Sequence, residues 1–147
     1  MEYRKLGRTD IDVSVFALGC WPFAGGAVWG DQDDDVSIAT VHAALDAGIN
    51  FFDTAEGYEN GHSERVLGRG LEGRRDEAVI ATKVSASHLK PADIVKACEQ
   101  SLENLRTDYI DLYQIHWPNW EVPIEVSLKT LEELKLSGKI RAIGVSN

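Results

Sequence analysis

The sequence predicts an α/β fold with a parallel sheet, in the form of a partial TIM (β/α)8 barrel of about five strands preceded by an N-terminal β-hairpin. Short apolar segments alternate with helical patterns, which is typical of right-handed βαβ units. Three consecutive strand-like segments also end in a polar residue, at Asp53, Lys83 and His116. Because a closed barrel needs eight strands and typically ~250 residues, residues 1–147 are expected to form the N-terminal part of one barrel domain.

The first elements expected are a hairpin and a buried strand. Residues 3–13 alternate apolar with polar side chains around Gly7 and Asp10, which predicts a hairpin that plugs the barrel from below. Residues 15–18 form an apolar run closed by Gly19, which indicates a strand buried on both faces of a parallel sheet.

A long loop and a helix are expected next. The loop over residues 20–30 is rich in Gly and Trp, and we expect Gly25 and Gly26 to lie inside it without opening a helix. Acidic residues 31–35 then favour a helix N-terminus, and Gly48 ends that helix. Its inward face is predicted to consist of Val36, Ala39, Ala43 and Ala47.

The strand–helix unit then recurs to the end of the sequence. Strands are expected at 49–53, 78–83, 109–113 and 140–145, and helices over 63–71, over 91–105 and from 123 to Gly138. The inward positions of the last two helices are predicted to be Ile94, Cys98, Leu102 and Leu105, then Ile124, Leu128, Leu131 and Leu134. An open doubly wound sheet uses the same units, but the turn after the first strand lacks G-x-G-x-x-G, so the barrel is favoured.

Composition excludes several classes of function. A net charge of −9 argues against a nucleic acid or an anionic membrane surface as a partner, and no segment approaches the ~20 apolar residues of a membrane span. Cys20 and Cys98 lack C-x-x-C spacing, and the histidines are scattered, so we expect no metal site and a reducing, cytoplasmic location. No G-x-S-x-G elbow indicates a hydrolase.

The strand-end residues suit proton transfer to a carbonyl oxygen. The phenol of Tyr58, just beyond Asp53, is a weak acid with an ordinary pKa near ~10 unless its anion is stabilised. Lys83 can stabilise that anion, and Asp53 can hold the lysine in place. His116 can donate a hydrogen bond that orients a substrate oxygen.

Each of these residues also has a structural interpretation. Asp53 could cap a turn, Tyr58 could be an exposed loop aromatic, and Lys83 could be a solvated strand end. A histidine in the position of His116 is more often structural than catalytic. The occurrence of all four residues at or just beyond successive strand ends favours a catalytic site.

Three segments resemble signatures of the aldo-keto reductase family. They are DTAEGY at 53–58 with SE at 63–64 and LG at 67–68, SLENL at 101–105 with DYIDLYQIH at 108–116, and GKIRAIGVSN at 138–147. The resemblance implies an NADPH-dependent oxidoreductase that reduces a small-molecule aldehyde or ketone to an alcohol on a TIM barrel. It implies Tyr58 as general acid, Lys83 and Asp53 as residues that tune it, and His116 as the residue that orients the carbonyl.

The resemblance also implies a cofactor site. Ser146 and Asn147 match positions that bind the nicotinamide carboxamide, Asp53 lies near the cofactor, and Trp21 matches a position lining the mouth. The sequence departs from the family at Cys20, where a threonine is common. Further departures are Glu59, in place of a glycine, and Asn119, in place of an aspartate.

Length sets the remaining expectations. In the family, strands six to eight and their loops bind most of the dinucleotide, so we expect a truncated reductase that alone binds NADPH weakly and that aggregates or self-associates through the open edge of strand five. An alternative of another class stays open: a non-catalytic half-barrel, or a reductase-like regulatory subunit. NADPH preference over NADH and the identity of the carbonyl are not predicted.

Overall fold

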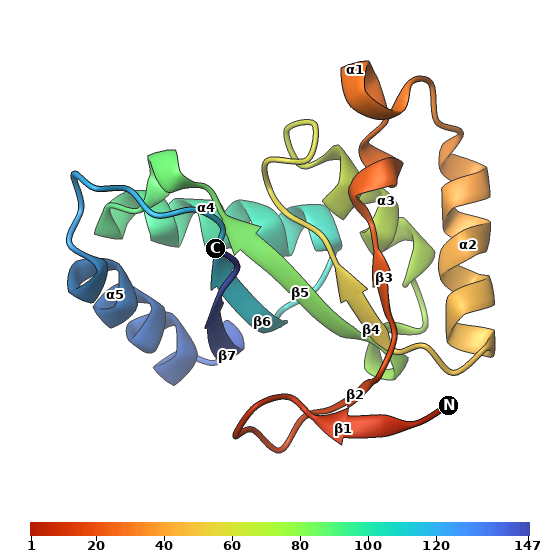
Figure 1. Cartoon of the computed structure of the whole chain (residues 1–147), viewed down its shortest axis with the longest axis horizontal. Helices are drawn as coiled ribbons and strands as arrows, with labels where there is room; N and C mark the ends of the chain where they lie inside the picture. The colour runs from red at the N-terminus through yellow and green to blue at the C-terminus, as the bar shows by residue number, and fades with distance from the viewer.

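A five-stranded parallel sheet forms the centre of the computed structural model, which describes all residues, 1–147. Its order is β3-β4-β5-β6-β7, so every strand lies beside its neighbour in sequence (Figure 1). The strands are β3 (Ala17–Gly19), β4 (Phe51–Asp53), β5 (Val79–Val84), β6 (Ile110–Ile115) and β7 (Ile140–Val145). A doubly wound sheet reverses its strand order and this one does not, so the predicted partial barrel is confirmed.

Four helices cover one face of this sheet. They are α2 (Asp34–Asp46), α3 (His62–Gly70), α4 (Pro91–Leu105) and α5 (Ile124–Leu136). The short helices are η1 (Trp21–Ala24), α1 (Gly26–Trp29), η2 (Arg75–Glu77) and η3 (Ala86–His88). The main core lies between the sheet and the helices and includes Phe52, Ile80, Tyr113 and Leu131. No helix is both long enough and apolar enough to cross a membrane.

The N-terminal hairpin packs on the other face of the sheet. Strands β1 (Tyr3–Lys5) and β2 (Asp12–Ser14) pair antiparallel, as predicted, and lie below the ends at which the strands begin (Figure 1). A second apolar cluster joins Ile11 and Val13 of the hairpin to side chains of the sheet, namely Val79, Ala81, Leu112 and Ala142. The hairpin therefore plugs the concave side of the partial barrel.

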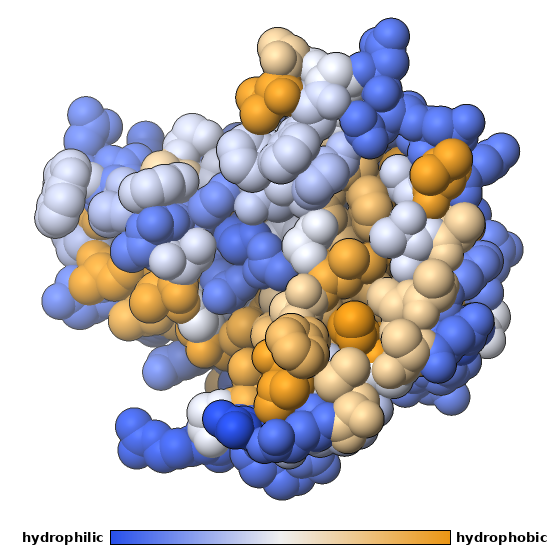
Figure 2. All heavy atoms as spheres, turned by 45° about the vertical axis from the view of Figure 1, so that its right-hand side comes forward, coloured by the Kyte–Doolittle hydropathy of each residue, from blue (hydrophilic) through white to orange (hydrophobic).

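The prediction that residues 15–18 form a strand buried on both faces is wrong. The strand β3 begins at Ala17, and Val15 and Phe16 are 41% and 66% exposed. Because β3 pairs only with β4, it is an edge strand that lacks a neighbour on its other side. Figure 2 shows a band of apolar side chains on the side of the molecule that carries β3.

The predicted inward face of α2 is also wrong. The helix starts after Asp33, whose carboxylate accepts hydrogen bonds from the backbone of Asp35 and Val36, and Val36 is 64% exposed. The buried positions are Ser37, Val41, Ala44 and Leu45. Large side chains gain more from burial than alanines do, so Val41 and Leu45 set the face rather than the alanine stripe. In α5, Ile124 is likewise exposed although Leu131 and Leu134 are buried as predicted.

The loop at 20–30 contains helical turns that the sequence did not predict. Gly26 opens the single turn α1, contrary to the expectation for Gly25 and Gly26, and both glycines have positive φ, at 64° and 70°. A Cβ atom on Gly26 would lie 2.8 Å from a carboxylate oxygen of Glu59, so α1 approaches the loop that carries Tyr58. No strand directly precedes α1, so the Rossmann turn remains excluded.

Candidate active site

Three of the four predicted catalytic residues are in direct contact at the C-terminal ends of the strands. Lys83 of β5 is 4% exposed, and its Nζ donates to Asp53 Oδ1 at 2.7 Å, to the Thr54 carbonyl oxygen at 2.7 Å and to Tyr58 OH at 3.2 Å. These acceptors satisfy all three protons of the ammonium group. A buried lysine is costly without a counter-charge, and Asp53 supplies it.

The strand register and one strained loop place these side chains. Strands β4 and β5 are parallel neighbours in which Asp53 lies opposite Ala81. Lys83 comes two residues after Ala81, so its side chain is on the same face of the strand, toward the mouth. Tyr58 comes from the loop that follows β4, where Glu59, Asn60 and Gly61 all have positive φ, at 47°, 49° and 76°. Left-handed backbone costs roughly 1 kcal/mol or more at a non-glycine residue, so the tight turn behind Tyr58 stores strain at Glu59.

His116 lies against the ring of Tyr58. Its backbone nitrogen donates to the Val84 carbonyl oxygen at 3.0 Å, which fixes it at the end of β6. The two ring centroids are 5.8 Å apart with an interplanar angle of 82°. Burial and then the Lys83 ammonium lower the pKa of His116, although Asp53 and Glu56 oppose this. The imidazole is therefore neutral at pH 7, with one nitrogen able to donate.

Aromatic rings extend on both sides of the Tyr58–His116 contact. Trp21 stacks on Tyr58 with centroids 5.7 Å apart, and Trp29 meets Trp21 edge-on at 5.5 Å. Trp117 stacks beside His116 at 6.3 Å. Trp21 thus lies at the mouth as expected, whereas Trp29 and Trp117 were not predicted. Trp29 and Trp117 could have been found from the sequence because they lie near Trp21 and next to His116, respectively.

The last two residues reach the same mouth from β7. The Ser146 backbone nitrogen donates to the Ile115 carbonyl oxygen at 2.9 Å, and Asn147 Nδ2 donates to the His116 carbonyl oxygen at 2.8 Å. Asn147 Nδ2 also contacts Ser146 Oγ at 3.3 Å. Both residues are exposed, and Asn147 Oδ1 accepts no hydrogen bond. The predicted cofactor residues and the predicted catalytic residues therefore share one end of the sheet.

Cys20 has a structural place beside the site. Its backbone nitrogen donates to the Asp53 carbonyl oxygen at 2.8 Å, and its carbonyl oxygen accepts from Ser63 Oγ at 2.6 Å. Burial, and secondarily Asp53, raise the pKa of the Cys20 thiol far above its ordinary value. The thiol therefore stays protonated and unreactive.

The main hollows of the surface are open depressions that do not include Lys83 or His116. One of about 350 Å³ lies among α2, α3 and α4, and one of about 340 Å³ lies between the Tyr58 loop, the loop after β5 and α4. The mouth is an open surface because five strands do not close a barrel. The contacts of Lys83, and not these hollows, define the site.

Comparison with known proteins identifies the family. The aldo/keto reductase family model matches residues 16–147. The chain belongs to the aldo/keto reductase family. The aldo-keto reductase YhdN of Bacillus subtilis is 46% identical over the whole chain, which covers 47% of YhdN. The NADH-specific methylglyoxal reductase of Escherichia coli is 38% identical over the whole chain, which covers 52% of that enzyme.

Solved aldo-keto reductases share the architecture. A thermostable aldo-keto reductase solved with the inhibitor epalrestat superimposes with a TM-score of 0.93 at 38% identity, covering 100% of this chain and 54% of that one. An aldo/keto reductase from Klebsiella pneumoniae, solved with NADP and acetate, gives a TM-score of 0.85 at 37% identity, covering 92% of this chain and 46% of that one. The chain thus spans about half the length of the relatives it matches.

Proposed function

We propose that this chain carries the proton-transfer part of an oxidoreductase that reduces an aldehyde or ketone to an alcohol. The observation that supports the proposal most strongly is the buried Lys83 ammonium bonded to both Asp53 and Tyr58 OH. A buried cation whose only side-chain partners are a carboxylate and a phenol is suited to stabilising a phenolate. Membership of the aldo/keto reductase family favours the same chemistry.

Tyr58 acts as the general acid in this proposal. It donates its phenolic proton to the carbonyl oxygen as the alcohol forms. The phenolate left behind faces the Lys83 ammonium at 3.2 Å, where Coulomb attraction is about 5 kcal/mol at an effective dielectric constant of 20. Asp53 keeps the ammonium at this position, so the charge that develops on Tyr58 meets a prepared partner.

His116 orients the substrate. A neutral imidazole at pH 7 donates one hydrogen bond without competing with Tyr58 as a proton source. Its ring lies edge-on to the Tyr58 ring, so the imidazole and the phenol can both bind the same carbonyl oxygen. The neighbouring rings of Trp21 and Trp117 provide an apolar surface beside that oxygen.

The chain's residues fit the nicotinamide end of NADPH. Asn147 offers an unpaired amide oxygen and Ser146 a hydroxyl, which together complement a carboxamide, and both lie beside His116. Asp53 and Trp21 would flank the cofactor at the same mouth. When bound, NADPH supplies the hydride that the carbonyl carbon accepts. Because one relative is named NADH-specific and another was solved with NADP, both cofactors belong in the test.

Turnover distinguishes this proposal from the non-catalytic alternative. We would join the chain to the part of YhdN that it does not match, and measure NADPH and NADH consumption with methylglyoxal and other small carbonyls. The proposal predicts carbonyl-dependent consumption. A chimera that binds NADPH but reduces no carbonyl would instead support a non-catalytic, regulatory half-barrel.

The chain by itself provides a second measurement. We expect weak NADPH binding in a fluorescence titration, and self-association through the open edge of β7 in a measurement of mass in solution. Micromolar binding by a monomer would contradict the expectation, and binding only by a dimer would indicate that two copies complete the site.

A further inference from the structure

Glu64 is a buried acid without a cation. It lies in the first turn of α3 and is 0% exposed. Its Oε1 accepts from Thr82 Oγ1 at 2.6 Å and its Oε2 accepts from Asn104 Nδ2 at 2.9 Å. Ser101 Oγ lies beside the carboxyl group without completing a hydrogen bond.

The surroundings of Glu64 favour its neutral form. The titratable groups that face it are Glu56 from the loop after β4, Tyr113 from β6 and Cys98 from α4, and none of these carries a positive charge. Burial raises the pKa of Glu64, and Glu56 adds to this, while the hydrogen bonds from Thr82 and Asn104 oppose it. Burial without a counter-charge therefore shifts the protonation equilibrium of Glu64 toward the acid.

Thr82 links Glu64 to the site. Successive residues of a strand point to opposite faces, so Thr82 faces the helices and Lys83 faces the mouth. A hydrogen bond that holds Thr82 to α3 fixes the rotation of the strand about its own axis at this point. The direction in which Lys83 leaves the strand is fixed with it.

The same helical turn holds the partners of Lys83. Ser63, next to Glu64, shares a hydrogen bond of 2.9 Å with Thr54 Oγ1, and the Thr54 carbonyl oxygen accepts from Lys83. Asn104, the second partner of Glu64, packs so closely against Gly61 that a Cβ there would collide with it. Gly61 ends the loop that carries Tyr58. The first turn of α3 therefore contacts Thr54 directly after β4, Thr82 of β5 and, through the Ser63 backbone nitrogen that donates to the Tyr58 carbonyl oxygen, the Tyr58 loop.

We propose that Glu64 is a positioning residue for the Tyr58–Lys83 pair, acting through Thr82 on β5 and Asn104 behind the Tyr58 loop. The inference rests on the proposed function for its meaning in catalysis, but the geometry it asserts is measurable without turnover. An apolar side chain would fill the same space at lower desolvation cost, so the carboxyl group is kept for its hydrogen bonds.

The test is the ammonium resonance of Lys83 in ¹⁵N-labelled chain, identified by its absence in Lys83→Met. Exchange with water is slow for a buried ammonium with three acceptors, so the wild-type chain should give a resolved signal at neutral pH. We would compare Glu64→Gln, Glu64→Leu and Thr82→Val, with Ser101→Ala as the matched control because its hydroxyl makes no hydrogen bond. Circular dichroism identifies the variants that fold.

The proposal predicts a split among these variants. Glu64→Gln keeps the acceptor for Thr82, and Asn104 can turn its amide to accept from the new NH₂ group, so the signal should persist there and in Ser101→Ala. Glu64→Leu and Thr82→Val should lose at least about half of the signal through faster exchange. If Glu64→Leu does not fold, Thr82→Val decides.

Two results would overturn the proposal. One is an unchanged Lys83 signal in folded Thr82→Val, and the other is the absence of any signal from the wild-type chain. Because turnover is not measured, a chimera without activity would refute the proposed function while leaving this inference standing. If the positioning role of Glu64 is refuted, Tyr58 likewise remains the candidate acid.

Discussion

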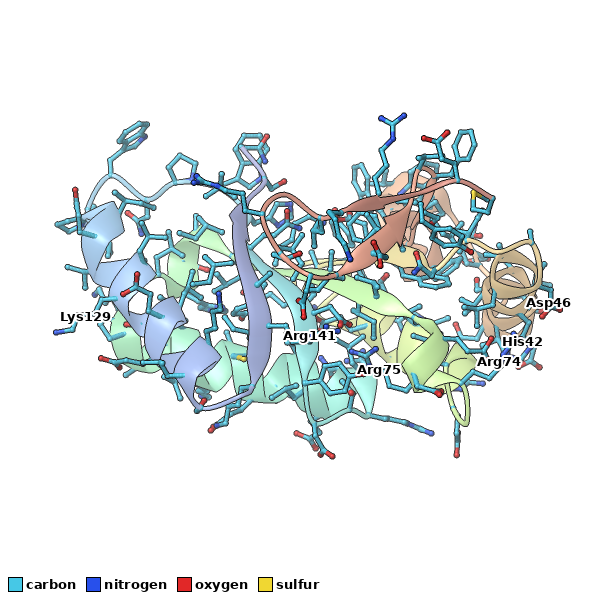
Figure 3. All side chains as sticks on the ribbon, turned by 90° about the horizontal axis from the view of Figure 1, so that it is seen from below. His42, Asp46, Arg74, Arg75, Lys129 and Arg141 are labelled. Carbon is cyan, nitrogen blue, oxygen red and sulfur yellow. The ribbon has the colours of Figure 1, made fainter.

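Replacing Asp111 should strongly destabilise the fold, because this residue joins three strands near the N-terminal end of the sheet. Asp111 of β6 has a side chain only 1% exposed and accepts from Arg75 at 2.7 Å, from Arg141 at 2.7 Å and from the Ile80 backbone nitrogen at 2.9 Å. It thereby joins β5, β6 and β7. Figure 3 shows Arg75 and Arg141 on the underside of the sheet.

The magnitude follows from what Asp111→Ala leaves unpaired. The buried Ile80 N–H loses its only side-chain acceptor, at roughly 1–3 kcal/mol. Arg75 is 18% exposed and becomes an uncompensated cation, and breaking such a pair costs roughly 3–5 kcal/mol in total. Arg141 is 44% exposed and regains water, so it adds little. We expect a loss of about 4 kcal/mol, against a total of roughly 5–15 kcal/mol for an ordinary domain.

Urea denaturation followed by tryptophan fluorescence measures this loss. With a slope of about 2 kcal/mol per molar urea, the midpoint should fall by about 2 M. Asp111→Asn keeps an acceptor for Ile80 and should lose about half as much, and Arg141→Ala about 1 kcal/mol or less. A loss below about 1 kcal/mol for Asp111→Ala, or an equal loss for Arg141→Ala, would refute the reasoning.

Two further predictions concern the loop and the helix behind the site. Glu59→Gly should raise the free energy of unfolding by roughly 0.5–1 kcal/mol, because glycine adopts the φ of 47° without strain; an unchanged urea midpoint would count against stored strain there. Glu64→Gln should flatten the pH dependence of stability. The raised pKa of Glu64 means that its stabilisation is complete below the ordinary value of about 4.3 and is lost as pH rises through the folded-state pKa, so wild type should weaken relative to Glu64→Gln over that interval. Urea midpoints of wild type and Glu64→Gln that run parallel at all pH values would contradict a raised pKa of Glu64.

The positions of Asp53, Lys83 and His116 could be predicted because they depend on two local facts. Apolar runs mark the strands, and a parallel sheet brings the ends of consecutive strands to one edge. The contact of Lys83 with Asp53 follows from adjacent strands in register. The helix 91–105 and the strand 140–145 were predicted with the observed bounds, because a proline begins the helix and the turn at Gly138 precedes the largely apolar strand.

The partners of buried polar residues could not be predicted in this way. An acidic residue in the first turn of a helix, such as Glu64, ordinarily faces water, and its partner Thr82 lies 18 residues further on. Asp111 likewise looks like one polar position in a strand until Arg75, 36 residues away, is placed beside it. The buried face of α2 was predicted wrongly for a related reason. A stripe of alanines is only weakly apolar, so tertiary packing decided which residues of the helix are buried.

The most direct test of the proposed chemistry is Tyr58→Phe in the chimera with YhdN, compared with Tyr109→Phe, whose ring packs under Arg75 at the other end of the sheet. Phenylalanine keeps the ring stacked on Trp21 and removes only the hydroxyl that Lys83 faces. Removing a general acid typically costs ~10²–10⁴-fold in rate, so carbonyl reduction should fall by that factor in Tyr58→Phe while NADPH affinity stays unchanged. Tyr109→Phe should retain full activity. Undiminished reduction by Tyr58→Phe would contradict the assignment of Tyr58 as the acid.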